Sequence, residues 1–350
     1  MADKRLIPLG SDTASTPTAG MRKAMAAAEV GDEQRQEDPT VNALCERVAA
    51  LLGHEDALYL PSGVMCNLIA VKAHTSPGDV VFAESMSHVI RAESAGAALA
   101  SGVLIEAIPT ETGIFTAADL FAALEESRAA PYPYAAPARL VCLEQSHNFG
   151  GGTVWTLAET EAVAEAARAE GLATHLDGAR LLNATTSLGA DPKDFGRLFD
   201  SVWIDFSKGL GAPVGAALAG SKEFIAAARR FKHLFGGAMR QAGIIAAGAL
   251  YALDHHVAGL SQDHENARRL ARGLTGLPGI EVANPNPATN MVFLLVEENL
   301  GGASGLAEKL RSRGVAVSVV TGRIRMVTHL DVSPEDIETT IAAFTELTGG

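Results

Sequence analysis

The sequence lacks the features that mark several classes of protein. It has no excess of positive charge, because 28 lysines and arginines face 41 aspartates and glutamates, for a formal net charge of −13. A chain with this balance repels phosphate backbones, so we expect no nucleic-acid partner. No apolar run reaches the roughly 18 residues that a membrane-spanning helix requires, and charges interrupt the first ten residues where a secretory signal would be apolar. We therefore expect no membrane association.

Cysteine is also scarce. The three cysteines, Cys45, Cys66 and Cys142, are odd in number and widely spaced, and they lack the paired CxxC arrangement of zinc sites. We expect no metal site and interpret these residues as reduced thiols in the core of a cytoplasmic protein.

What the sequence does have is apolar content: 47% of its 350 residues are hydrophobic and 20% are charged, which is enough for a large core in one domain or two. Up to about residue 255, short apolar runs alternate with helical patterns. Buried strands are predicted over 79–83, 139–143, 171–176 and 201–206, and capped helices over 116–130 and 156–170. The alternation predicts an α/β fold with a mainly parallel, doubly wound sheet.

The pattern changes after residue 255. A charged helix over 262–274 precedes several strands with few helices between them, and a closing helix follows Pro334. We expect a large domain over 1–255, including an N-terminal arm, and a smaller C-terminal α+β domain over 256–350. A ligand is expected in the cleft between them.

Three short segments carry residues suited to chemistry. Ser62-Gly63 opens a helical pattern, and a helix start with small residues favours an anion. Asp177 and Arg180 follow a predicted strand, at the edge where such sheets gather ligand-binding residues. Lys208 ends another predicted strand before a glycine-rich turn, and a lysine among small residues in a cleft is suited to forming a Schiff base.

Each segment alone has a simpler interpretation: a capped helix start, a structural ion pair or a solvated strand end. Together they supply what pyridoxal 5′-phosphate (PLP) requires, namely an amine, an anion site, a carboxylate for the ring nitrogen and a cation for the substrate carboxylate. A dinucleotide site is not favoured, because no GxGxxG lies between a first strand and helix.

The sequence resembles the L-threonine aldolases, PLP enzymes of the aspartate-aminotransferase-like fold, also called fold type I. The resemblance covers nearly the whole chain. The motifs that carry it are Ser11-Asp12-Thr13, residues 37–42, Pro61-Ser62-Gly63, Ser87-His88, Ser146-His147-Asn148, residues 175–180, residues 207–215, residues 236–241, Thr289-Asn290 and residues 327–333.

The resemblance implies a role for each matching residue. Lys208 would hold PLP as a Schiff base, Asp177 would pair with the ring nitrogen, and His88 would lie over the ring and reach the substrate hydroxyl. His147 would act on the hydroxyl proton, directly or through water. The phosphate would be bound at Ser62, Gly63 and Val64, and further cofactor and substrate contacts would come from Ser11, Arg180, Arg325 and, across a subunit interface, Arg240.

The chain departs from the family pattern at several positions. Gly10 replaces an arginine, Val64 replaces a threonine, and His233 replaces a lysine. A tyrosine expected after Gly31-Asp32 is missing, and Arg35 lies in that segment, where we expect it to contact the substrate. These differences lie at positions expected to contact the substrate or the cofactor phosphate, and Lys208 is unchanged.

The resemblance implies cleavage of an L-β-hydroxy-α-amino acid to glycine and an aldehyde by a homotetramer with shared active sites. The substrate is threonine, allo-threonine, or a larger or acidic analogue. Two alternatives remain open: another PLP reaction such as β-elimination or racemisation, and a catalytically silent binding protein. The presence of both His88 and His147 favours the aldolase reaction over the first, and an intact Lys208 argues against the second.

Overall fold

A seven-stranded sheet forms the centre of the molecule in the computed structural model, which describes residues 5–349. Its strand order is β2-β8-β7-β6-β5-β3-β4. Strands β3 to β7 run parallel to one another, and β8 is antiparallel to both β2 and β7. The strands are β2 (Asp56–Leu60), β3 (Val80–Glu84), β4 (Leu104–Ile108), β5 (Ala138–Glu144), β6 (Ala173–Gly178), β7 (Ser201–Asp205) and β8 (Ala216–Gly220). The predicted mainly parallel sheet is confirmed.

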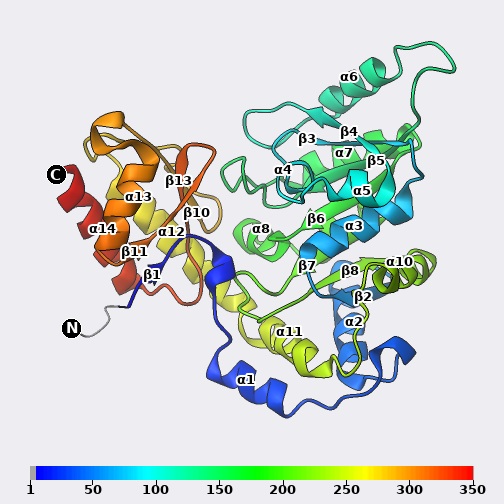
Figure 1. The fold of residues 1–350 in the computed structure, drawn as a ribbon, viewed down its shortest axis with the longest axis horizontal. Coiled ribbons are helices and arrows are strands. Elements are labelled where there is room, and N and C mark those ends of the chain that lie inside the picture. The colour runs from blue at the N-terminus through cyan, green and yellow to red at the C-terminus, as the bar shows by residue number, and fades with distance from the viewer. Residues whose placement is uncertain (1–4, 350) are drawn as a thin grey trace.

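Helices cover both faces of this sheet (Figure 1), because alternate strand residues point to opposite faces and both sets are apolar. One face packs against α3 (Gly63–His74), α4 (His88–Arg91), α5 (Gly96–Ser101) and α10 (Lys222–Leu234). The other packs against α2 (Pro39–Leu52), α6 (Ala117–Ser127), α7 (Leu157–Ala169), α8 (Leu181–Leu188), α9 (Pro192–Gly196) and α11 (Gly243–His255), with α1 (Ala19–Ala26) lying on α11.

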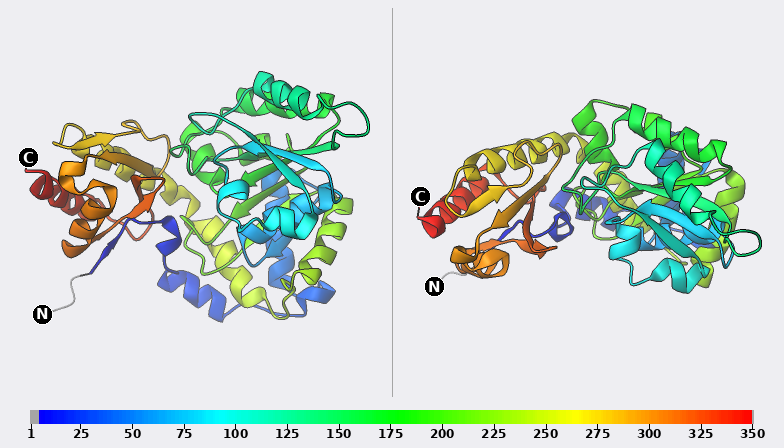
Figure 2. Two further views of the ribbon diagram at one scale, coloured as in Figure 1. Left: turned by 45° about the horizontal axis from the view of Figure 1, so that its top comes forward. Right: turned by 90° about the horizontal axis from the view of Figure 1, so that it is seen from above.

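The C-terminal part has its own core and an antiparallel sheet of order β12-β13-β10-β9. Its strands are β9 (Ile280–Val282), β10 (Met291–Val296), β12 (Ser318–Val320) and β13 (Arg323–Val327), and its helices are α12 (Leu260–Leu274), α13 (Gly302–Ser312) and α14 (Pro334–Thr348). The views in Figure 2 show it beside the central sheet, with the start of the chain against it.

The start of the chain belongs to this C-terminal part by its pairing. Strand β1 (Ile7–Pro8) pairs in parallel with β11 (Val315–Ala316), and Ile7 and Leu9 are buried in the C-terminal core. The proposed division between residues 255 and 256 stays a prediction. We predicted the whole N-terminal arm in the large domain, whereas β1 pairs with a strand of the C-terminal part. Within residues 5–349, no helix combines the length and apolarity needed to span a membrane.

Candidate active site

A cavity of about 460 Å³ opens beside the carboxyl ends of β5, β6 and β7. This is the edge of an open α/β sheet at which ligands bind. Residues from the N-terminal arm and from β13 also contribute to its wall. It is lined by nine residues that the sequence singled out: Ser11, Ser62, Gly63, Val64, His88, Asp177, Arg180, Lys208 and Arg325.

Asp177 lies at the end of β6, buried at the cavity wall. Its Oδ2 accepts a hydrogen bond from Asn67 Nδ2 at 2.8 Å and its Oδ1 accepts one from the Ala179 amide at 3.0 Å. Burial, reinforced by the negative charge of Glu144, raises the pKa of Asp177 to about 6. The carboxylate is therefore a site where a positively charged ligand group is favoured.

Lys208 follows β7 and extends into the cavity from the turn. Its Nζ lies 2.5 Å from Asp205 Oδ2 and 5.4 Å from the centre of the Trp203 ring. Asp205 is held in turn by the Ser207 amide and hydroxyl, which donate to its Oδ1. Asp205 is a functional residue that we did not predict, although its position three residues before the lysine, at the end of the same strand, is a usable signal.

The start of α3 forms another wall. Ser62 caps this helix, its hydroxyl accepting a hydrogen bond from the Met65 amide at 3.2 Å. A Cβ atom added to Gly63 would lie 2.2 Å from the Trp203 ring, so only glycine fits against the indole here. The first amides of a helix have no partner within it, and together with the helix dipole they favour an anion.

Two arginines from distant parts of the chain reach the cavity. Arg180 is buried and donates from Nε and Nη2 to the two oxygens of Asp12, at 2.8 and 2.7 Å, rather than pairing with Asp177. Arg325, on β13, donates to Asn148 Oδ1 at 2.8 Å and to the Gly10 carbonyl at 3.1 Å. Because each guanidinium carries five N–H groups, both arginines keep donors for a ligand.

The two histidines occupy different positions. His88 lines the cavity, and its Nδ1 lies 2.8 Å from Glu93 Oε1. Burial lowers the pKa of His88, but the neighbouring carboxylates Glu93, Asp177 and Glu144 together outweigh burial and leave that pKa above its usual value. His147 is fully buried outside the cavity wall, with its Nε2 2.9 Å from Glu84 and 4.0 Å from Glu144.

Comparison with known proteins identifies the family. Residues 8–299 match the sequence model of the β-eliminating lyases. The chain is 37% identical over 348 residues to low-specificity L-threonine aldolase 1 of Arabidopsis thaliana, covering 97% of this chain and 96% of that protein. It is 38% identical over 336 residues to low specificity L-threonine aldolase of Escherichia coli K12, covering 95% and 96%. The chain belongs to the L-threonine aldolase family.

The fold agrees with this assignment. A threonine aldolase of Leishmania major superposes with a TM-score of 0.83 at 23% identity, covering 97% of this chain and 98% of that one. A serine palmitoyltransferase of Sphingomonas wittichii superposes with a TM-score of 0.76 at 18% identity, covering 99% and 88%. The predicted fold type I architecture is confirmed.

Arg35 and Arg240, like His147, do not line the cavity of their own chain. Arg35 and Arg240 are exposed, and both approach Asp32 Oδ2, at 3.9 Å from Arg35 Nε and 2.9 Å from Arg240 Nη1. His233, on α10, is also exposed. The roles of Arg35 and Arg240 therefore stay predictions.

Proposed function

We propose that this member of the threonine aldolase family cleaves an L-β-hydroxy-α-amino acid to glycine and an aldehyde with the help of PLP. The observation that carries the proposal is the meeting, in one cavity, of a lysine amine, a buried carboxylate, a helix start and two guanidinium groups. These are the groups that the reaction requires, and they come from four separate parts of the chain.

PLP fits the residues present. Lys208 would bind the cofactor aldehyde, the amides at the start of α3 with Ser62 would bind its phosphate, and Asp177 would hold its protonated ring nitrogen. Within the described residues Asp177 has no salt bridge of its own, since Arg180 pairs with Asp12. A cationic ring nitrogen would supply the missing positive charge and lower the pKa of Asp177.

Arg180 and Arg325 would hold the substrate carboxylate, with Ser11 beside them. Two guanidinium groups fix both the position and the rotation of a carboxylate, because each presents its N–H groups in a plane. Their grip would set the Cα–Cβ bond perpendicular to the plane of the cofactor ring. Bound PLP supplies an electron-accepting ring that stabilises the negative charge left at Cα when this bond breaks.

His88 would remove the proton from the β-hydroxyl group. Its Nδ1 faces Glu93, so its Nε2 is the nitrogen available to the substrate, and a general base of this kind contributes about 10²–10⁴-fold to a rate. His147 is buried behind Glu144, which lines the cavity. We therefore propose that His147 acts on the hydroxyl proton through an intervening group or water.

The cytoplasmic homotetramer implied by the resemblance belongs to this proposal. In such a homotetramer, Arg35 and Arg240, which are exposed in the single chain, would enter the active site of a neighbouring subunit. Arg35 would there add positive charge beside the substrate, which favours acidic substrates such as 3-hydroxyaspartate.

A substrate panel tests the proposal. The PLP-loaded protein is incubated with L-threonine, L-allo-threonine, phenylserine and 3-hydroxyaspartate, with Lys208→Ala as the blank, and glycine and aldehyde are measured separately. We expect equal amounts of both products from at least one substrate and neither from the variant. Release of ammonia and a 2-oxo acid without glycine would instead establish β-elimination.

A further inference from the structure

A chain of hydrogen bonds leads from Asp177 away from the active-site cavity and through the sheet. Asn67 Nδ2 donates to Asp177 Oδ2 at 2.8 Å, and Asn67 Oδ1 lies 3.0 Å from His175 Nε2. His175 Nδ1 lies 2.8 Å from Ser201 Oγ, which is also 2.8 Å from His74 Nε2. Asn67, His175 and Ser201 are buried, and the mechanism proposed above uses none of them.

Trp203 fixes the orientation of the Asn67 amide. The indole Nε1–H can only donate, and it lies 2.7 Å from Asn67 Oδ1. The amide oxygen must therefore face Trp203, and the NH₂ group faces two carboxylates, Asp177 Oδ2 and, at 2.6 Å, Glu93 Oε1. The same Glu93 oxygen contacts His88, so Asn67 links the carboxylate of the cofactor site to the proposed base.

The orientation of Asn67 determines which atom donates and which accepts in each of the other hydrogen bonds of this network. Since Asn67 Oδ1 accepts, His175 must donate from Nε2 and accept at Nδ1 from the Ser201 hydroxyl, which then accepts from His74 Nε2–H. Burial lowers the pKa of His175 to about 3 and that of His74 to about 4, so both rings are neutral at pH 7. All donors thus point toward Asp177, an arrangement in which the hydrogen bonds polarise one another.

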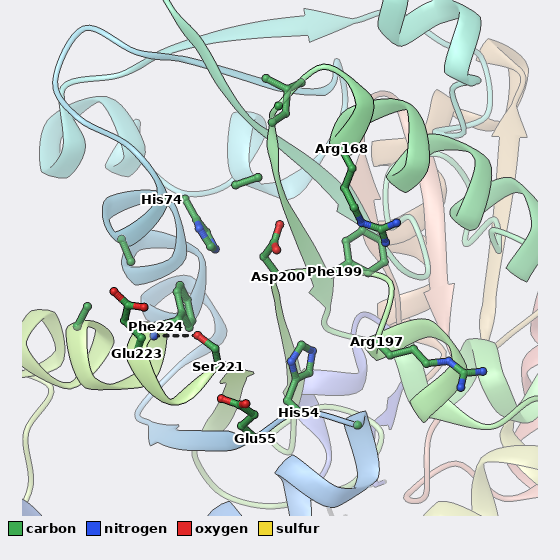
Figure 3. Close-up of a pocket in the computed structure, with 16 residues that line it drawn as sticks. His54, Glu55, His74, Arg168, Arg197, Phe199, Asp200, Ser221, Glu223 and Phe224 are labelled. Carbon is green, nitrogen blue, oxygen red and sulfur yellow. Dashed lines mark hydrogen bonds between the residues drawn. The ribbon is translucent and has the colours of Figure 1, made fainter.

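The chain of hydrogen bonds ends at His74, which lies in the wall of a second cavity of about 970 Å³ at the opposite edge of the sheet. Figure 3 shows His74 beside Phe224 in its wall, and their rings stack at 4.7 Å with an interplanar angle of 17°. Stacking holds the imidazole of His74 in place. One end of the chain of hydrogen bonds is therefore fixed by this packing, and the other end, at Asn67, is fixed by Trp203.

We infer that Asn67, oriented by Trp203 and His175, is a positioning residue that keeps Asp177 aimed at the cofactor ring nitrogen as an ionised acceptor. The inference rests on the proposed function and extends it. Asp177 is surrounded by the negative groups Glu93 and Glu144, which disfavour its charge. One amide with two donors shared between Asp177 and Glu93 offsets this repulsion without introducing a cation that would compete with the ring nitrogen.

The test uses Asn67→Asp, which keeps the side-chain shape and replaces two donors by an acceptor. Asn266→Asp is the matched control, since Asn266 is 2% exposed against 1% for Asn67 and donates to the Val332 carbonyl outside the cavity wall. The full-length protein is loaded with PLP labelled with ¹⁵N in the ring, and the ¹⁵N chemical shift is recorded together with the Kd of PLP.

We expect the Asn67→Asp signal to move from the protonated toward the unprotonated ring position, and PLP to bind about 10-fold or more weakly, as expected for loss of a hydrogen bond to a charged group. The control should keep the wild-type values. A folded Asn67→Asp protein with an unchanged ¹⁵N shift and a Kd within about twofold of wild type, a difference well below one tenfold step, would overturn the inference.

A second variant tests the same inference if the Asn67→Asp protein does not fold. Trp203→Phe removes the N–H group that orients Asn67, together with the outer indole carbons that lie against Gly63. We expect a ¹⁵N shift in the same direction, and an unchanged shift would overturn the inference. The proposed function fails separately, if the wild-type protein does not bind PLP through Lys208.

Discussion

The guanidinium group of Arg180 holds both oxygens of Asp12, 168 residues earlier in the chain, through hydrogen bonds of 2.8 and 2.7 Å. The pair ties the N-terminal arm to the central sheet at the wall of the cavity. It also sets the direction of the arginine that we propose for the substrate carboxylate, so its loss should affect stability and substrate binding together.

Asp12→Asn should lower the free energy of unfolding by about 3–5 kcal/mol at pH 7, because it leaves a buried guanidinium without its counter-charge. Burial raises the pKa of Asp12, but Arg180 outweighs burial and holds it well below its usual range. The pair therefore stabilises the protein above the usual carboxyl pKa, and this contribution is lost as the pH falls below about 4.

Urea unfolding at several pH values checks this prediction. The wild-type protein should lose stability below pH 4 more steeply than Asp12→Asn, whose side chain does not titrate, and the KM for the amino acid should rise in the variant. Parallel stability curves for the two proteins would show that the pair contributes nothing to acid sensitivity.

Lys208→Ala should abolish the visible absorbance that PLP acquires when it binds an amine as a Schiff base. The buried lysine Lys232 forms an ion pair with Glu33 outside the cavity wall and should not substitute for Lys208. Absorbance spectra of both proteins after PLP addition and desalting measure this directly. A retained absorbance in the variant would remove Lys208 from its proposed role.

Gly63→Ala should weaken PLP binding and destabilise the protein by about 1–3 kcal/mol, the usual cost of overpacking. The added methyl group would lie 2.2 Å from the Trp203 ring, so the start of α3 or the indole must move. Gly259→Ala, where a Cβ meets no atom within 4 Å, is the control. Thermal unfolding with and without PLP should separate the two variants, and equal behaviour would contradict the packing argument.

Glu93→Gln should lower the pKa of His88, because it removes the negative charge beside Nδ1 and keeps an oxygen that accepts hydrogen bonds. A general base acts when deprotonated, so the rise of kcat/KM with pH should move to lower pH in the variant. NMR titration of the imidazole together with the pH profile measures both. A lowered pKa without movement of the profile would mean that His88 is not the base.

Arg35→Tyr should shift the substrate preference toward small neutral amino acids if Arg35 enters a neighbouring active site. The ratio of kcat/KM for L-threonine to that for 3-hydroxyaspartate should rise in the variant. An identical ranking of substrates before and after the change would place Arg35 outside the pocket.

The alternation of apolar runs and capped helices in the sequence predicted most of the central sheet. The predicted runs over 139–143 and 201–206 correspond to β5 and β7, and the capping boxes at Thr116 and Thr156 open α6 and α7. Strand β8 escaped prediction because its sequence, Ala-Ala-Leu-Ala-Gly, contains no β-branched residue. It is also antiparallel, which the alternation of strands and helices does not predict.

The residues that contact the cofactor site were predictable where they stand in motifs. Those that support them were not, because hydrogen bonds between side chains depend on contacts that local patterns do not encode. Asn67 lies 110 residues before Asp177 and sits in an apolar helix, where an asparagine has no periodicity of its own. Glu93 acquires its role only when the folded chain places it beside both His88 and Asn67.

The most direct test of the central claim is to identify the products formed from L-threonine by the PLP-loaded protein, using ¹H NMR. We predict glycine and acetaldehyde in equal amounts, with none from the Lys208→Ala protein. Formation of 2-oxobutanoate and ammonia, or of D-allo-threonine, with no glycine would contradict it and would assign this active site to elimination or racemisation.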